Sequence, residues 1–185
     1  MKTIDYYLSP SSPWTYLGHA RFAGIAKAAG AKVNVKPVDY GVIFPQSGGL
    51  PLAKRAPQRQ AYRLQELKRW RAHLGVELIL QPKHFPVDAG PAAQLIAGAP
   101  EEKRMALAGD FLSALWKDDR NIADPAVLDE IGKRHGVTHG DKARYEAFTQ
   151  EAIGRNVFGA PSYVYRDEIF WGQDRLDFLD RALQK

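Results

Sequence analysis

The sequence predicts an α/β domain into which a long all-helical segment is inserted. Three observations carry this prediction: a strand–helix–strand pattern over residues 3–39, a helical pattern over about 58–153, and two short extended segments before a last helix. Strand, helix and strand in this order open a parallel unit whose crossover is expected to be right-handed. The length of 185 residues fits one domain, or one domain that carries a sizeable insertion.

The N-terminal unit begins with a strand that ends in a turn. Residues 3–8 are β-branched and aromatic, and a cluster of serines and prolines over 9–13 stops them. Pro13 suits the first turn of a helix, and Ser12 suits its cap. A second strand is expected near residues 33–38, after this helix.

The middle of the chain is predicted to be helical apart from two breaks. Residues 41–57 and about 81–91 contain several glycines and prolines and are expected to be loops. The helices are predicted at about 58–74, 90–98, 101–116, 124–135 and 141–153. In the first of them the spacing places near one side the residues Tyr62, Leu64, Leu67, Trp70 and Leu74.

Two extended segments at 162–166 and 168–171 and a helix over about 173–183 complete the chain. The order βαβ, helical block, ββα is that of a thioredoxin-like fold with a helical insertion. Residues 1–45 and 154–185 are therefore expected to form a discontinuous thioredoxin-like domain, and residues 46–153 an all-helical insertion domain.

Composition excludes several kinds of chemistry. The chain contains 0 cysteines, which rules out disulfides, thiolate metal sites and a cysteine nucleophile, so any thiol must come from a cofactor or substrate. The 5 histidines lack metal-ligand spacing, and no metal site is expected. With no signal-peptide pattern and no apolar run of membrane-spanning length, a cytoplasmic protein without a membrane partner is predicted.

The formal net charge of +5 favours an anionic partner. The basic residues gather over 54–71, where most are interpreted as a solvated helix face. No nucleic-acid-binding motif accompanies them, so a small anion is preferred to nucleic acid.

Three short patterns could carry chemistry, although each has a plain structural interpretation. The Ser12-Pro13 start of a helix could stabilise a thiolate, because a helix N-terminus presents free N–H groups and the positive end of a dipole; taken alone, it is a helix cap. Ala160-Pro161 could expose the Ala160 backbone to a peptide-like ligand, or form a simple turn. Gln173-Asp174 could hold an ammonium group, or cap the last helix.

In their order along the chain, these patterns resemble the 2-hydroxychromene-2-carboxylate isomerases, which share a fold with kappa-class glutathione transferases. The resemblance covers almost the whole chain, and the ordered series is far more specific than any one motif. Its anchors are Asp5-Tyr6-Tyr7, Ser12-Pro13-Trp14-Thr15-Tyr16-Leu17, Tyr62, Glu66-Leu67-Lys68-Arg69-Trp70, Phe85-Pro86, Ile122-Ala123-Asp124-Pro125, Val157-Phe158-Gly159-Ala160-Pro161 and Phe170-Trp171-Gly172-Gln173-Asp174-Arg175-Leu176.

The resemblance implies glutathione as cofactor, an aromatic acid as substrate and a homodimer. Ser12 is the implied catalytic residue, because only the second Ser-Pro pair, and not Ser9-Pro10, is followed by the family's aromatic, hydroxyl, Tyr and Leu pattern. The family usually shows an Asn near position 50 and a Lys near 59, where this chain has Leu50 and Arg59. The implied glutathione-binding residues are Ala160, Pro161, Gln173, Asp174 and Arg59, and the implied substrate-binding residues are Trp14 and Tyr62.

The implied reaction interconverts 2-hydroxychromene-2-carboxylate and trans-o-hydroxybenzylidenepyruvate by reversible thiolate addition. A glutathione transferase acting on another electrophile, and a non-catalytic glutathione-binding protein of thioredoxin fold, are the alternatives. A disulfide oxidoreductase is excluded, because the chain has no cysteine to oxidise.

Overall fold

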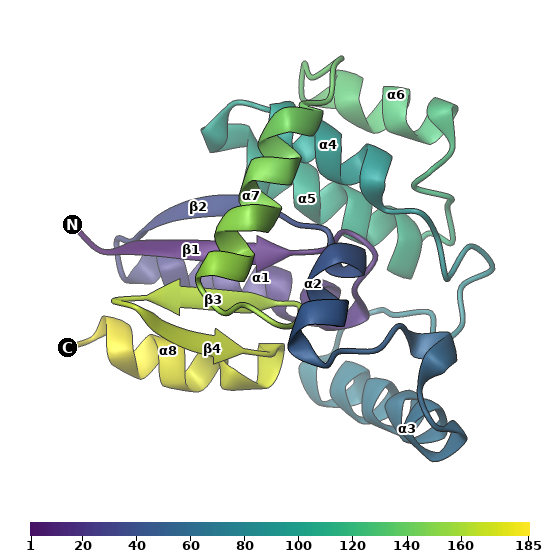
Figure 1. Cartoon of the computed structure of the whole chain (residues 1–185), viewed down its shortest axis with the longest axis horizontal. Coiled ribbons are helices and arrows are strands. Elements are labelled where there is room, and N and C mark those ends of the chain that lie inside the picture. Colours follow the sequence, from purple (N-terminus) through teal and green to yellow (C-terminus); the bar gives the residue numbers. More distant parts are fainter.

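A four-stranded sheet organises the fold, and the computed structural model describes all residues from Met1 to Lys185 (Figure 1). The strand order is β2-β1-β3-β4. β1 (Thr3–Leu8) pairs in parallel with β2 (Lys32–Pro37), and the antiparallel strands β3 (Ser162–Tyr165) and β4 (Glu168–Trp171) complete the sheet. The predicted thioredoxin-like fold is thus confirmed.

Helices cover both faces of this sheet. In Figure 1, α1 (Pro13–Ala28) lies behind the strands, where it also contacts α8 (Leu176–Leu183), and α7 (Lys142–Gly154) crosses in front of them. The remaining helices lie between β2 and β3 in the sequence, as the predicted insertion requires. They are α2 (Tyr40–Ser47), the 3₁₀ turn η1 (Leu52–Lys54), α3 (Pro57–Leu74), α4 (Gly90–Gly98), α5 (Glu101–Trp116) and α6 (Pro125–Arg134).

The central strand β1 contributes side chains to both cores. Ile4, Tyr6 and Leu8 enter the main cluster of 28 buried residues, which extends over α1, α5 and α8. Tyr7 points the other way, into a cluster of 7 buried residues under α2 and α7. Because successive strand residues face opposite sides, large buried side chains on both sides are expected of a strand covered on both faces.

The prediction of a loop over residues 41–57 was wrong in its first part. Helix α2 forms there because the Asp39 carboxylate accepts from the Gly41 N–H at 2.7 Å and because Tyr40 and Ile43 are buried. Pro45 lies inside this helix, and Gly48, with φ of 74°, ends it. Glycine and proline content alone therefore misled the prediction. The predicted boundary between residues 45 and 46 falls within α2.

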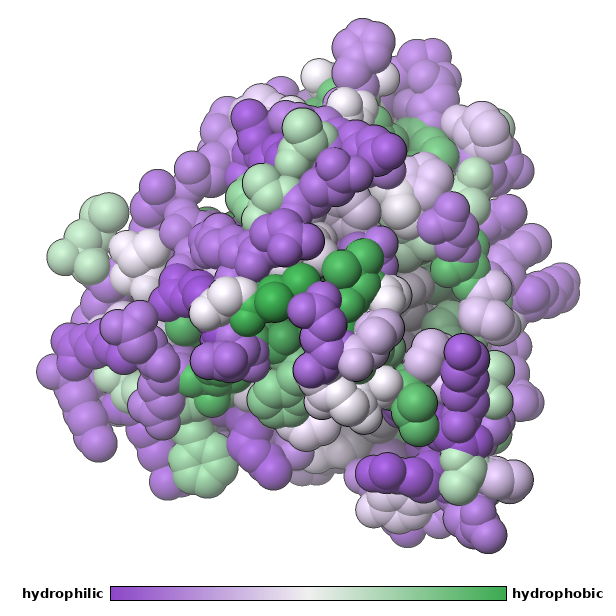
Figure 2. Space-filling model, viewed as in Figure 1, coloured by the Kyte–Doolittle hydropathy of each residue, from purple (hydrophilic) through white to green (hydrophobic).

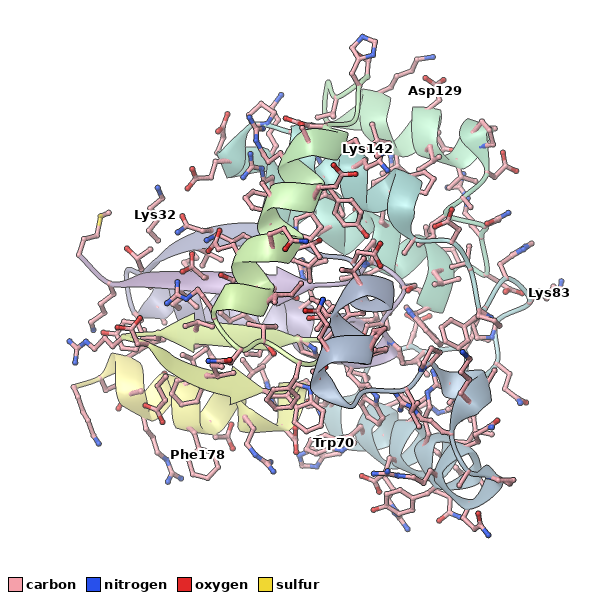
Figure 3. All side chains as sticks on the ribbon, viewed as in Figure 1. Lys32, Trp70, Lys83, Asp129, Lys142 and Phe178 are labelled. Carbon is pink, nitrogen blue, oxygen red and sulfur yellow. The ribbon has the colours of Figure 1, made fainter.

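The face that helix α3 buries agrees with the predicted one except at Tyr62. Tyr62 is 55% exposed, whereas the buried residues of this helix are Arg63 and Leu67. Trp70 follows on the same side of α3 and packs against the main core. By contrast, Phe178 on α8 is exposed and points outward (Figure 3). The prediction is thus confirmed at Leu64, Leu67, Trp70 and Leu74, whereas Tyr62 lies outside this face and Arg63 belongs to it.

The surface seen in Figure 2 is mostly hydrophilic, with a hydrophobic patch over α2 and the adjoining end of α7. None of the helices combines the length and the hydropathy that crossing a membrane requires.

Candidate active site at the start of helix α1

Ser12 is the N-cap of helix α1. Its Oγ accepts a hydrogen bond from the Thr15 N–H at 3.2 Å, its backbone is extended, and Pro13 occupies the first helical position. The Ser12 N–H donates to Ser9 C=O at 3.1 Å, which closes the turn between β1 and α1. The capping interpretation is therefore confirmed. It leaves the hydroxyl hydrogen of Ser12 free for a second bond, because a hydroxyl accepts and donates at once.

A second free donor lies beside this hydroxyl. The N–H of Trp14 makes no hydrogen bond within the chain, and the half-buried Trp14 side chain packs against the main core. Unpaired N–H groups in a first helical turn carry the positive end of the helix dipole. The start of α1 therefore offers two hydrogen-bond donors and a favourable field to an anion.

The backbone of Ala160 is the third unpaired element of this region. The Ala160-Pro161 bond is cis, and neither the N–H nor the C=O of Ala160 is hydrogen-bonded within the chain. The turn is held from both sides, because Gly159 C=O accepts from Ser162 Oγ at 2.6 Å and from Tyr40 Oη at 2.8 Å. A fixed turn with a free donor and acceptor can pair with a peptide-like ligand as a short strand would.

The sheet brings these pieces to one end. Tyr7 near the end of β1 lies opposite Ser162 at the start of β3, and Ser162 lies opposite Trp171 at the end of β4. Three segments therefore lie at the same end of the strands: the Ser12 turn, the Ala160-Pro161 turn and the Gly172–Asp174 segment. The Gly172 N–H donates to Pro161 C=O at 2.8 Å and ties the last two together.

Gln173 and Asp174 differ in what they present to a ligand. Gln173 lies in the 3₁₀ turn η2 (Gln173–Arg175) and is 1% exposed. It packs so closely against Gly18 of α1 that a Cβ added to Gly18 would lie 2.7 Å from the Cβ of Gln173. Its Oε1 and the nearby Tyr163 hydroxyl are buried without partners. Burial raises the pKa of the Tyr163 phenol, which stays protonated. Of the two residues, only Asp174 has its side chain at the surface, where its carboxylate pairs with Arg175 at 2.6 Å.

The predicted residues of helix α3 are not brought to Ser12 by any contact within the chain. Arg59 is exposed and has no carboxylate partner, and Tyr62 lies under the guanidinium of Arg69, with Cζ 5.8 Å from the ring centroid. Leu50, at the position where the family usually has Asn, is 47% exposed. The proposed roles of Arg59 and Tyr62 stay predictions.

Arg63 is the functional candidate that the sequence prediction missed. It was grouped with the solvated basic residues, yet it is 9% exposed and its Nη2 is buried without a hydrogen-bond partner. Its spacing from Leu67, Trp70 and Leu74, at four, seven and eleven residues, is that of one helix face and could have revealed it.

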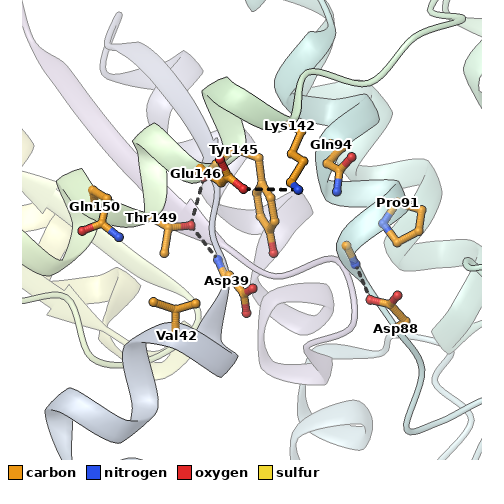
Figure 4. Close-up of a pocket in the computed structure, with 11 residues that line it drawn as sticks. Asp39, Val42, Asp88, Pro91, Gln94, Lys142, Tyr145, Glu146, Thr149 and Gln150 are labelled. Atoms are coloured by element: carbon orange, nitrogen blue, oxygen red, sulfur yellow. Dashed lines mark hydrogen bonds and ion pairs between the residues drawn. The ribbon is translucent and has the colours of Figure 1, made fainter.

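A separate hollow of about 380 Å³ opens between α2, α4 and α7 and contains none of the predicted site residues (Figure 4). Several of its polar groups are already paired. Thr149 Oγ1 accepts from the Asp39 N–H at 3.0 Å, Asp88 accepts from the Gly90 N–H at 2.9 Å, and Lys142 pairs with Glu146 across 3.7 Å. Ser12, Trp14 and Ala160 do not line this hollow, and the Ser12 turn remains the candidate site.

Residues 3–184 match the DSBA-like thioredoxin domain family. The chain belongs to this family. It nevertheless contains no cysteine, and Ser12 occupies the start of the helix that follows β1. A DSBA-like domain without a thiol of its own keeps the fold and the helix terminus but cannot form an internal disulfide.

Relatives along the full length carry one activity in their names. A 2-hydroxychromene-2-carboxylate isomerase of Sphingobium xenophagum is 27% identical over 98% of both chains, and one of Pseudomonas putida is 26% identical over 97% of this chain and 93% of its own. A solved structure of a 2-hydroxychromene-2-carboxylate isomerase superposes with a TM-score of 0.83 at 22% identity, covering 98% and 94% of the two chains. DsbM, a cytosolic disulfide reductase of Pseudomonas aeruginosa solved with GSH, gives 0.64 at 20% identity over 99% and 100%.

Proposed function

We propose that this protein is a glutathione-dependent isomerase that interconverts 2-hydroxychromene-2-carboxylate and trans-o-hydroxybenzylidenepyruvate, or a related pair of aromatic acids. The observation that carries the proposal is the group of unpaired backbone and hydroxyl donors at Ser12, Trp14 and Ala160, gathered at one sheet edge in a chain without cysteine. Full-length similarity to isomerases of this name, and the GSH-bound structure of a fold relative, support it.

The residues of this chain suit a glutathione site. The free N–H and C=O of Ala160 pair with the cysteinyl part of the tripeptide, and the exposed carboxylate of Asp174 meets the ammonium of the γ-glutamyl part. Gln173 contributes by position only, since its side chain is turned into the domain. Ser12, at the start of α1, would then hold the cysteinyl sulfur through its hydroxyl.

Ser12 and the helix terminus have one chemical task, which is to hold the thiol as a thiolate. When bound, glutathione supplies a thiolate that adds reversibly to a conjugated carbon of the substrate and so permits rotation about a former double bond. The Ser12 hydroxyl donates a hydrogen bond to that sulfur. The unpaired Trp14 N–H, at the positive end of the helix dipole, further stabilises the negative charge. Lowering a thiol pKa from about 8.5 to about 6.5 corresponds to about 2.7 kcal/mol, which makes the thiolate the major form at neutral pH.

The proposal is tested by following the two substrates spectroscopically with and without glutathione. Isomerisation that requires glutathione in catalytic rather than stoichiometric amounts is the expected result. Consumption of glutathione with a panel of electrophiles and no isomerisation would instead identify a transferase. If calorimetry finds no glutathione binding at millimolar concentration, the protein has kept the fold without this chemistry.

A further inference from the structure

Arg63 occupies an unusual position for an arginine. It lies in the second turn of α3 and is 9% exposed, with Cζ 5.0 Å from the centroid of the Phe85 ring and 5.9 Å from that of Trp116. No carboxylate pairs with it, and its buried Nη2 has no hydrogen-bond partner in the chain. A buried guanidinium is costly to keep without partners, and folded proteins almost always supply them.

The neighbouring Trp116 also has a buried hydrogen-bond donor without an acceptor. This side chain is 0% exposed, and its Nε1–H is also buried without a hydrogen-bond partner. Arginine and tryptophan side chains can donate hydrogen bonds but cannot accept them. The unmet requirement of this contact is therefore an acceptor, and a carboxylate oxygen is one.

Charge adds to this requirement. Neither Arg55 nor Arg59 forms an ion pair, while the nearest acidic residue of α3, Glu66, is paired with Arg69. Burial, and then the positive charge of Arg55, lower the pKa of Arg63 to about 10, so the guanidinium remains charged at neutral pH. Three arginines thus come close together without a counter-ion.

We infer that Arg63 binds a carboxylate of the ligand and that the aromatic rings of Phe85 and Trp116 hold its guanidinium in place. The planar fork of arginine matches both oxygens of a carboxylate. Stacking on aromatic rings fixes the plane of that fork in advance. The choice of a carboxylate over another oxyanion rests on the proposed function, since glutathione and the aromatic acids both carry one.

Equilibrium binding of trans-2-hydroxycinnamate, measured by tryptophan fluorescence without glutathione, tests this inference. We expect R63M to bind this acid at least tenfold more weakly than the wild type. K68M is the matched control, because Lys68 lies on the same helix but is exposed and forms no ion pair; its dissociation constant should stay within twofold. The neutral amide of the same acid should bind the wild type at least tenfold more weakly than the acid does.

A second arm uses glutathione as the carboxylate source. Loss of glutathione binding in R63M with hydroxycinnamate binding intact would assign Arg63 to the cofactor, and the reverse would assign it to the substrate. If R63M does not fold, R63K carries the test, since it keeps the charge without the planar fork and should still bind severalfold more weakly. The inference would be overturned if R63M bound both glutathione and the hydroxycinnamate as tightly as the wild type does, or if the wild type bound neither at millimolar concentration. No turnover is measured, so failure here is distinguishable from failure of the isomerase proposal.

Discussion

The Ser12 turn and the Arg63 contact both hold hydrogen-bond donors without partners, but they are built in different ways. At Ser12 the donors come from Ser12 and Trp14, two residues apart at the start of one helix, in a half-buried turn. At Arg63 the donors are the guanidinium of Arg63 on α3 and the indole N–H of Trp116 at the end of α5. The guanidinium also contacts the ring of Phe85, which lies in the segment between α3 and α4. One site follows from local backbone geometry and the other from packing.

This difference suggests a division of tasks. A helix terminus is fixed by its cap and needs no distant support to favour an anion. A buried guanidinium depends on whichever residues the fold places around it, and it discriminates more strongly because its desolvation is offset only by a ligand with the right charge. We therefore assign the thiol chemistry to the Ser12 turn and ligand selection to Arg63.

Removing the Ser12 hydroxyl should have the largest effect of all. S12A is expected to lower the glutathione-dependent rate by tenfold to about a hundredfold, because the bound thiol loses its side-chain hydrogen bond and its pKa rises. Steady-state kinetics at saturating glutathione measure this. S9A, in the same turn, should change the rate by less than about twofold, since the Ser9 hydroxyl contacts Ser11 and the bond from the Ser12 N–H is accepted by the Ser9 backbone C=O, which S9A keeps.

Loss of the cap must be separated from loss of the hydroxyl donor. S12D keeps an acceptor for the Thr15 N–H but cannot donate to a thiolate and repels it. We expect S12D to be as stable as the wild type and at least as slow as S12A. An S12D variant with the wild-type rate would show that Ser12 serves only as a cap.

The contact between α1 and η2 is expected to place the Ser12 turn beside Asp174. A Cβ added at Gly18 would meet Gln173 Cβ at 2.7 Å and the Tyr163 hydroxyl at 3.0 Å, so G18A should lower the free energy of unfolding by about 1–3 kcal/mol. On the same helix, Gly24 has nothing within 4 Å, and G24A should stabilise by about 0.5–1 kcal/mol. Urea unfolding of both variants checks this; equal stabilities would contradict the close packing at Gly18.

Asp174 should contribute a smaller effect, because its carboxylate is exposed. D174N is expected to raise the KM for glutathione about fivefold without changing kcat, since a solvated ion pair is worth up to about 1 kcal/mol. The control is D177N, on the exposed side of α8. Should both variants raise KM equally, general charge rather than a specific contact would be responsible.

The ligand-free stability of R63M should change least. The methionine loses the contacts with Phe85 and Trp116 but also removes an unpaired buried charge, so the free energy of unfolding should stay within about 1 kcal/mol of the wild type or rise. Thermal and urea unfolding without ligand measure it. A loss of more than about 3 kcal/mol would mean that Arg63 is structural, which would break the comparison between the two sites.

Much of the fold was predictable because its signals are local. The Ser12-Pro13 helix start, the helix over 101–116 and the strand over 3–8 were placed within one or two residues of their observed bounds. Helix α2 was missed because its stability comes from burying Tyr40 and Ile43, which outweighs the unfavourable Pro45.

The candidate site divides in the same way. Ser12 was predicted from its turn, whereas the inward position of Gln173 depends on packing against Gly18 of another helix. Arg63 was hidden among other basic residues, because a buried helix face is recognised from its apolar residues and a charged residue on the same face is assigned to solvent. Tertiary contacts between distant segments decide what a single sequence leaves open.

The most direct test of the Ser12 site is the thiol pKa of bound glutathione, measured from the ultraviolet absorbance of the thiolate during a pH titration of the complex. Because the donors at Ser12 and Trp14 favour the charged form, the account predicts a pKa at least one unit below that of free glutathione, with most of the difference lost in S12A. A bound thiol that titrates like the free tripeptide, with the same pKa in the wild type and S12A, would contradict it.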